Sequence, residues 1–208
     1  MNRRTVCFSL TLAVAGLTAP EAFAHHVMGG AMPATFKDGL LSGFGHPIIG
    51  LDHFAAVVAV GCLAAAHGAA VALVFGFVVA MMAGVVLHLY GAPLPATEIW
   101  VALSVIALGA VLLRRTQIGT PVALALFAAT GLVHGYALGE SIYGAEPTPL
   151  YAYLAGLAIV QGAIALAAMG LTRMAASRSA DVSIVRLVGA GIAGVGFAIL
   201  MQQVVPAV

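Results

Sequence analysis

"GAAVALVFGFVVAMMAGVVLHLY", residues 68 to 90, contains no Asp, Glu, Lys or Arg. A helix needs about 20 such apolar residues to cross a hydrocarbon core about 30 Å thick. The rest of the chain is similar: 62% of its 208 residues are hydrophobic and 7% are charged, and its mean hydropathy is +1.11. Soluble domains are about one quarter charged, so the composition predicts a polytopic membrane protein.

Six apolar segments are expected to form an all-α bundle of six transmembrane helices, which makes residues 25–208 a single domain. The alternating apolar and polar residues of a membrane β-barrel are absent, and helices are the other way to pair every backbone amide in lipid. Gly and Pro residues separate the segments. The predicted spans are residues 39–65, 68–90, 97–113, 119–139, 149–171 and 184–205.

The first 24 residues have the pattern of a cleaved secretory signal peptide. Two arginines precede a short apolar stretch, and Ala22-Phe23-Ala24 fits the cleavage site. Cleavage would make His25 the mature N-terminus, outside the cytoplasm. The alternative is an uncleaved first transmembrane helix, although Pro20 interrupts a core that is already short for a span.

The distribution of basic residues gives the same orientation. Cytoplasmic loops are enriched in Lys and Arg, and with the N-terminus outside, the loops after the first, third and fifth spans face the cytoplasm. Those loops contain every basic residue of the mature chain except Lys37, namely Arg114, Arg115, Arg173, Arg178 and Arg186. We therefore expect a multi-pass protein of the inner (cytoplasmic) membrane. The net charge of +1 and the lack of a basic patch argue against nucleic acid as a partner.

The first span contains ionisable residues in the stretch "GFGHPIIGLDH", residues 43 to 53. An aspartate within a span costs about 2.5–3.5 kcal/mol on insertion scales and usually marks an ion path, a proton relay or a ligand site. Asp52 is therefore a candidate functional residue. The alternative is a structural carboxylate paired with the backbone or a hydroxyl.

An unbroken helix would not bring the two histidines of this stretch together. His46 and His53 would be separated by about 10 Å of rise, whereas one metal ion holds imidazole nitrogens at about 2 Å. Pro47 and the nearby glycines predict a kink or unwound turn between residues 43 and 50. Such a break would let His46 approach Asp52 and His53 and would free carbonyl groups for an ion.

Two imidazoles and one carboxylate suit a borderline divalent metal such as Ni, Co, Zn or Cu, whereas Mg and Ca prefer oxygen ligands. Further candidate ligands lie toward the predicted outer side: His134, Glu140, His88, Glu98, His25 and His26. Interfacial packing is the alternative for His88, and a polar tail is the alternative for the two N-terminal histidines. We expect His67 to be a solvated turn residue and Gln161 to form hydrogen bonds between helices.

The stretch "HPIIGLDHFAAVVAVG", residues 46 to 61, resembles the H-P-x-x-G-x-D-H signature of the HupE/UreJ family. The secretory signal and the six spans are similar too, so the resemblance covers the mature chain. It implies a nickel or cobalt permease in which His46, Asp52 and His53 belong to the transport site. Many members carry H-G-x-A-H-G-x-E in the fourth span, whereas here Leu138 stands at the second histidine and Glu140 comes one position early. The stretch "GESIYGAEPTP" resembles a subgroup for which cobalt uptake has been suggested.

These observations predict a secondary permease, not an enzyme, that takes up Ni²⁺ or Co²⁺, with Zn²⁺ or Cu²⁺ less favoured. The cation would pass through His134 and Glu140 to the first span, and no permanently bound cofactor is expected. The alternative is a non-transporting accessory protein or sensor for hydrogenase or urease maturation. An intramembrane enzyme or haem protein is a third class. No nucleophile pattern or HExxH supports an enzyme, while His88 and His134 stay open as paired haem ligands. The bilayer is a partner, and homo-oligomer formation stays open.

Overall fold

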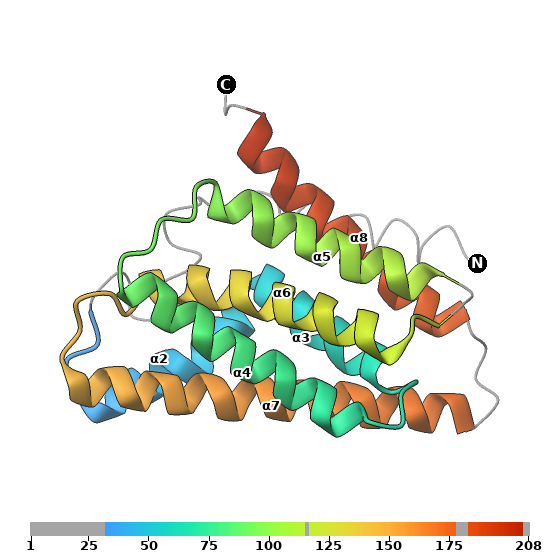
Figure 1. Cartoon of the computed structure of the whole chain (residues 1–208), viewed down its shortest axis with the longest axis horizontal. Coiled ribbons are helices and arrows are strands. Elements are labelled where there is room, and N and C mark those ends of the chain that lie inside the picture. The colour runs from blue at the N-terminus through green and yellow to red at the C-terminus, as the bar shows by residue number, and fades with distance from the viewer. Residues whose placement is uncertain (1–31, 115–116, 178–182, 206–208) are drawn as a thin grey trace, which may run out of the picture.

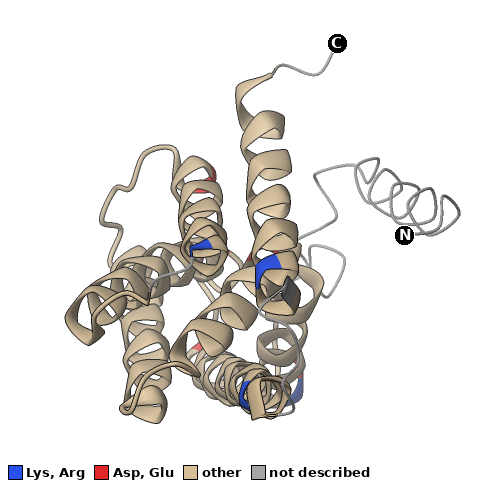
Figure 2. Ribbon diagram, turned by 90° about the vertical axis from the view of Figure 1, so that its right-hand side faces the viewer, with Lys and Arg blue, Asp and Glu red and all other residues tan. Residues whose placement is uncertain are grey.

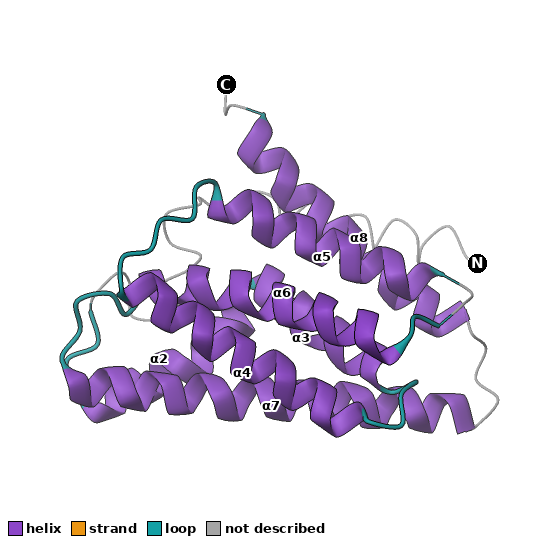
Figure 3. Ribbon diagram, viewed as in Figure 1, coloured by secondary structure: helices purple, strands orange, loops and turns teal. Residues whose placement is uncertain are grey.

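The computed structural model describes residues 32–114, 117–177 and 183–205. The predicted signal peptide, residues 1–24, lies outside these ranges, as do His25 and His26. The described residues form seven helices and no strand (Figure 3). In chain order they are α2 (Phe36–Ile49), α3 (Leu51–Ala64), α4 (Ala70–Leu89), α5 (Thr97–Leu113), α6 (Thr120–Glu140), α7 (Pro147–Ser177) and α8 (Ser183–Val204).

Each of the six predicted apolar segments is helical. Four helices, α4, α6, α7 and α8, are long and apolar enough to cross a membrane, and α2 with α3 forms a fifth candidate span that bends by 78°. The helix α5 is apolar but has only 17 residues. The chain is thus a multi-pass helical membrane protein, while the count of six spans remains a prediction. Figure 2 shows how few charged residues interrupt the ribbon.

The helix α2 and its continuation α3 pack along α7 in the same direction, as Figure 1 shows. Gly39 packs against the backbone of Pro149 near the start of both segments. Gly61 packs against the carbonyl of Ala165 further along. A side chain at either glycine would collide with backbone, so glycine is what permits this close approach, as is common between membrane helices.

The other helices form two further pairs. The helices α4 and α6 are parallel, because Gly131 contacts Phe77 and Gly139 contacts His88. The helices α5 and α8 are antiparallel, because Gly109 contacts Ala193 whereas Gly196 contacts the earlier residue Ile106. All three pairings agree with a chain that reverses direction at each predicted span.

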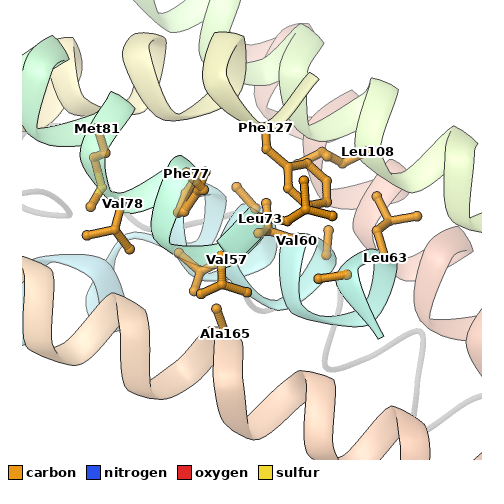
Figure 4. Close-up of a cluster of buried hydrophobic side chains, with 14 of the residues drawn as sticks. Val57, Val60, Leu63, Leu73, Phe77, Val78, Met81, Leu108, Phe127 and Ala165 are labelled. Carbon is orange, nitrogen blue, oxygen red and sulfur yellow. The ribbon is translucent and has the colours of Figure 1, made fainter. Parts of the chain in front are cut away.

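Buried side chains from six helices, α3 to α8, fill the centre of the bundle, and Figure 4 shows part of this cluster. Val57 of α3 lies between Ala165 of α7 and Phe77 of α4, while Phe127 of α6 and Leu108 of α5 lie on the opposite side of the cluster. The hydrophobic effect gives little attraction between helices in a bilayer, because lipid tails are as apolar as the side chains. Dispersion contacts of this kind therefore hold the helices together. The core therefore fixes α3, which carries Asp52 and His53, against its neighbours.

Two polar residues differ from the sequence-based expectation. His67 is 9% exposed, and its Nδ1 lies 3.3 Å from Thr120 Oγ1, so the prediction of a solvated residue is wrong. His67 is buried by tertiary packing, because the start of α6 covers the α3–α4 turn. Gln161 is 1% exposed, but its Nε2 has no hydrogen-bond partner among the described residues, so this nitrogen does not form the expected interhelical bond.

Candidate metal-binding site

The first membrane segment is broken at Gly50, which ends α2 and begins α3. Gly50 has φ −70° and ψ 102°, an extended conformation, and its N–H donates to His46 O at 2.9 Å. Pro47 lies within the last turn of α2 and has no N–H to continue the helical pattern. The helix nevertheless continues to Ile49. The predicted break between residues 43 and 50 therefore falls at the end of that range.

The absence of a side chain at Gly50 lets the following residues fold back against the break. A Cβ at this position would lie 2.8 Å from Cδ2 of His53 and 3.2 Å from Oδ1 of Asp52. The first distance is shorter than real Cβ contacts. Gly50 is thus needed for the placement of these two side chains, beyond its part in the bend.

Asp52 lies in the first turn of α3 and is 3% exposed. Its Oδ1 accepts the backbone N–H of His53 at 2.7 Å. The first amides of a helix have no intrahelical acceptor, and the positive end of the helix dipole attracts a negative charge. This backbone contact is what the structural alternative for Asp52 predicts. That alternative gives no reason for His53 beside the carboxylate and for the two further histidines that His53 contacts.

His53 and His134 are joined by a buried contact between α3 and α6. Their Nδ1 atoms are 2.7 Å apart, and their rings meet edge to face with centroids 4.9 Å apart. On its other side, His134 Nε2 lies 2.9 Å from Ser104 Oγ of α5. A polar chain therefore crosses three helices at the centre of an apolar bundle.

The hydroxyl of Ser104 determines which ring nitrogen of His134 and of His53 carries the proton. It donates to the carbonyl of Val101 at 2.7 Å, so it accepts from Nε2–H of His134. A neutral His134 then has its lone pair on Nδ1 and accepts from Nδ1–H of His53. Neutral His53 consequently carries its own lone pair on Nε2, the nitrogen that lies 4.0 Å from Asp52 Oδ1.

His46 completes the cluster from the last turn of α2. It is 4% exposed, and its ring centroid lies 5.9 Å from that of His53. Four of the five principal predicted ligands, His46, Asp52, His53 and His134, are thus brought together at the break. Ser104 was missed by the sequence reasoning, and its only signal was a hydroxyl within an apolar helix.

The other predicted residues lie at helix ends. Glu140 is the last residue of α6 and is exposed, and Glu98 is half-buried in the first turn of α5. His88, in the last turn of α4, packs edge to face against Tyr136 and Tyr143, with centroids 4.6 and 5.7 Å away. The structure therefore does not bring Glu140 or His88 into the cluster.

In the part of the chain that the structure describes, no three His, Cys, Asp or Glu side chains are arranged so that they could hold one metal ion. The cluster contains suitable groups, but the direct contact between His53 and His134 occupies the nitrogens that face each other. A cation bound by three of these residues would require side-chain movement.

Comparisons with known proteins agree with the sequence motif. The family model described as HupE / UreJ protein matches residues 12–199. The chain is also similar to Protein HupE of Rhizobium leguminosarum bv. viciae, with 32% identity over 196 residues, which cover 92% of this chain and 97% of that protein. No solved structure matches the chain.

The family match thus spans most of the chain, including the broken first segment and the histidine of α6 that reaches it. A curated relative aligns over nearly its full length. The chain belongs to the HupE/UreJ family.

Proposed function

We propose that the protein is a secondary permease that takes up a divalent transition metal, Ni²⁺ or Co²⁺, into the cytoplasm. The observation that carries this proposal is the grouping of His46, Asp52 and His53 at a break within a membrane segment. Membership of the HupE/UreJ family supports a role connected with nickel or cobalt transport.

The chemistry of the cluster suits a borderline cation. With neutral imidazoles, His46, Asp52, His53 and His134 together carry one negative charge, that of Asp52. A buried carboxylate among imidazoles interacts favourably with a divalent metal. Ni²⁺ and Co²⁺ accept both of these ligand types.

The geometry favours a first contact between the cation and Asp52 with His53. Asp52 Oδ1 and His53 Nε2 are 4.0 Å apart, and a small approach of the two side chains would let one metal lie about 2.0–2.2 Å from both atoms. His46 would then become a third ligand through rotation of its side chain. This arrangement keeps the contact between His53 and His134 intact, so binding does not require it to break.

In this proposal His134 and Ser104 orient His53 and do not bind the first cation. Metal-ligating histidines usually donate their second ring N–H to a neighbouring acceptor, which fixes the tautomer and the ring. His134 Nδ1 is such an acceptor, and Ser104 fixes the tautomer of His134 in turn. The role of His134 thus differs from the direct ligand that the sequence suggested.

Two buried polar groups continue inward from the cluster. Thr130 is one helical turn before His134 on α6, and Gln161 is one turn before Ala165, which contacts Gly61 of α3. Both residues are 1% exposed, and neither Thr130 Oγ1 nor Gln161 Nε2 has a hydrogen-bond partner among the described residues. Unpaired polar atoms in a dry core are costly. The waters around a hydrated cation turn their hydrogens outward, so the Thr130 hydroxyl oxygen and the amide oxygen of Gln161 could accept from them. The Nε2–H group of Gln161 could donate to a further water on the path.

The membrane potential can drive this direction of transport. A potential of 100 mV, negative inside, gives about 2.3 kcal/mol for each charge moved inward. The sequence has no phosphate-binding loop of the GxxxxGK[ST] type that would point to ATP. The proposal therefore assigns the energy source to the potential or an ion gradient.

Metal accumulation in proteoliposomes made with the full chain tests the proposal. We expect Co²⁺ or Ni²⁺ to accumulate under an inside-negative potential and to do so much less with Asp52→Asn. The matched control is Asp38→Asn in the same segment, because Asp38 accepts hydrogen bonds from Thr35 at the start of α2 and Asn preserves an acceptor. Equal accumulation by wild type and Asp52→Asn, at equal protein content, would contradict the proposal.

The non-transporting accessory protein or sensor is the second candidate. The burial of His46, Asp52 and His53 favours it in one respect, since a buried site suits a protein that holds a metal without releasing it. Binding of Co²⁺ or Ni²⁺ that depends on Asp52, measured by calorimetry in detergent, with no accumulation in proteoliposomes, would support this candidate over the permease.

A further inference from the structure

A cavity of about 400 Å³ lies at the end of the bundle opposite to the start of α2. It is lined by the C-terminal parts of α3, α5 and α7, by the residues that follow α3 and α5, and by the first turn of α8. These helix ends lie at the right-hand side of Figure 1. Its volume falls within the range of small-molecule sites, about 300–1,000 Å³. The predicted topology places this end at the cytoplasmic surface of the membrane.

Three arginines line the cavity, and none of its lining residues is acidic. Arg114, Arg173 and Arg186 come from α5, α7 and α8, or from the residue directly after the helix in the case of Arg114. Among the described residues, no ion pair involves any of the three. The part of the lining that the structure describes is therefore strongly positive and contains no carboxylate.

Two of these arginines have an explanation within the fold. Arg173 donates from Nε to Ala65 O at 3.1 Å and from Nη2 to His67 O at 3.2 Å, which holds the α3–α4 turn. Arg114 is the C-cap residue of α5 and is exposed. Cations at helix C-termini interact favourably with the helix dipole.

Arg186 has no such explanation. It lies in the first turn of α8, where the dipole and the unpaired amides disfavour a cation. No acidic residue is present in that turn. Its Nε is buried and has no hydrogen-bond partner among the described residues. A buried guanidinium nitrogen beside the positive end of a helix would be paired by an anion in the cavity.

We propose that this cavity binds the phosphate group of an anionic phospholipid from the cytoplasmic leaflet. Arg186, Arg114 and the first amides of α8 would receive the phosphodiester, because guanidinium groups and helix N-termini both bind phosphate oxygens. Basic pockets between membrane helices on the cytoplasmic side are a common form of lipid headgroup site.

The apolar part of the lining favours a lipid over a free anion. Leu63, Val111, Leu112, Ile118, Ile184 and Val185 line the same cavity. Inorganic phosphate would leave these side chains without a partner, whereas an acyl chain would cover them. A bound lipid would thus connect the start of α8 to α3, α5 and α7. This site is independent of the proposed transport of metal.

The test uses full-length protein purified in detergent and depleted of lipid. Thermal unfolding and native mass spectrometry are followed with added phosphatidylglycerol, with phosphatidylcholine of the same acyl chains, or with inorganic phosphate. We expect phosphatidylglycerol alone to raise the unfolding midpoint and to be retained. Arg186→Gln should weaken its apparent affinity about tenfold or more, the loss expected for a charge-assisted hydrogen bond.

The matched control is Lys37→Gln, which removes one charge at the opposite end of the bundle and should leave lipid affinity unchanged. If Arg186→Gln does not fold, Arg114→Gln at an exposed position provides the same comparison, and Arg186→Lys should retain part of the effect. Equal stabilisation by the two lipids would overturn the proposal. Full stabilisation by inorganic phosphate would also overturn it and would identify a site for free anions.

Discussion

The Nδ1 atoms of His53 and His134 lie 2.7 Å apart, although the two residues are 81 positions apart in the sequence. Two neutral imidazoles can share this contact only if one donates and the other accepts. The partnership of His134 with Ser104 makes His53 the donor and directs its other nitrogen toward Asp52. The two histidines are therefore expected to have unequal roles in metal binding.

Substitution of the two histidines separates these roles. We expect His53→Ala to abolish uptake, because it removes a proposed ligand. His134→Ala should lower metal affinity by about 10–100-fold, as for other groups that orient a ligand. His134→Asn should restore part of the affinity, since its amide oxygen can accept from His53. The rate of Co²⁺ uptake, measured as a function of Co²⁺ concentration, gives the maximal uptake and the apparent affinity of each variant. An equal loss of uptake in the two alanine variants would contradict the unequal roles.

Ser104→Ala tests the hydrogen bond between Ser104 and His134. Without the hydroxyl, Nε2–H of His134 loses its acceptor, so the tautomer that accepts from His53 is no longer favoured. We expect a drop in metal affinity of about tenfold or more with little loss of stability. Ser177→Ala is the control, because Ser177 also donates to a carbonyl three residues earlier but has no histidine partner. The same affinity in both variants would remove Ser104 from the site.

Gly50→Ala tests the packing at the break. The backbone angles of Gly50 are accessible to alanine, but the new Cβ would press on His53 and Asp52. We expect transport to fall about tenfold or more because both proposed ligands move. Gly162→Ala is the control, since nothing lies within 4 Å of a Cβ there. Normal uptake by Gly50→Ala would show that the close contact does not matter for transport.

Gln161→Leu is expected to change stability and transport in opposite directions. It removes a buried amide nitrogen without a partner, so the protein should become more stable by about 1 kcal/mol. If Gln161 lies on the path inward, uptake should fall. Gln202→Leu, at an exposed position on α8, should alter neither strongly. A Gln161→Leu protein that is less stable and transports normally would refute the proposed path through this residue.

The sequence predicted the helical segments and the region of the break, because apolar length and the effects of Gly and Pro are local properties. It could not predict that the break would lie at Gly50 and not at Pro47, since α2 stays helical through the proline. The approach of His134 to His53 also depends on how α3 packs against α6. A single sequence does not record that contact.

Glu140 shows where sequence spacing misleads. It follows His134 by six residues, which on a continuous helix is about 9 Å of rise. The helix α6 is continuous, so Glu140 ends at its exposed terminus while His134 lies in the core. Ser104 shows the opposite case, a residue with no motif that tertiary packing places beside a histidine.

The pairing of α2 and α3 with α7 has a consequence during synthesis. The first membrane segment is made about a hundred residues before the helix against which it chiefly packs. At about 5–20 residues per second, this interval lasts roughly 5 to 20 s. Throughout that time Asp52 lies within or near the bilayer, and α7 is not yet present to pack against its membrane segment. Delayed insertion, or shelter by the translocation machinery, would then be a normal stage in the biogenesis of this protein.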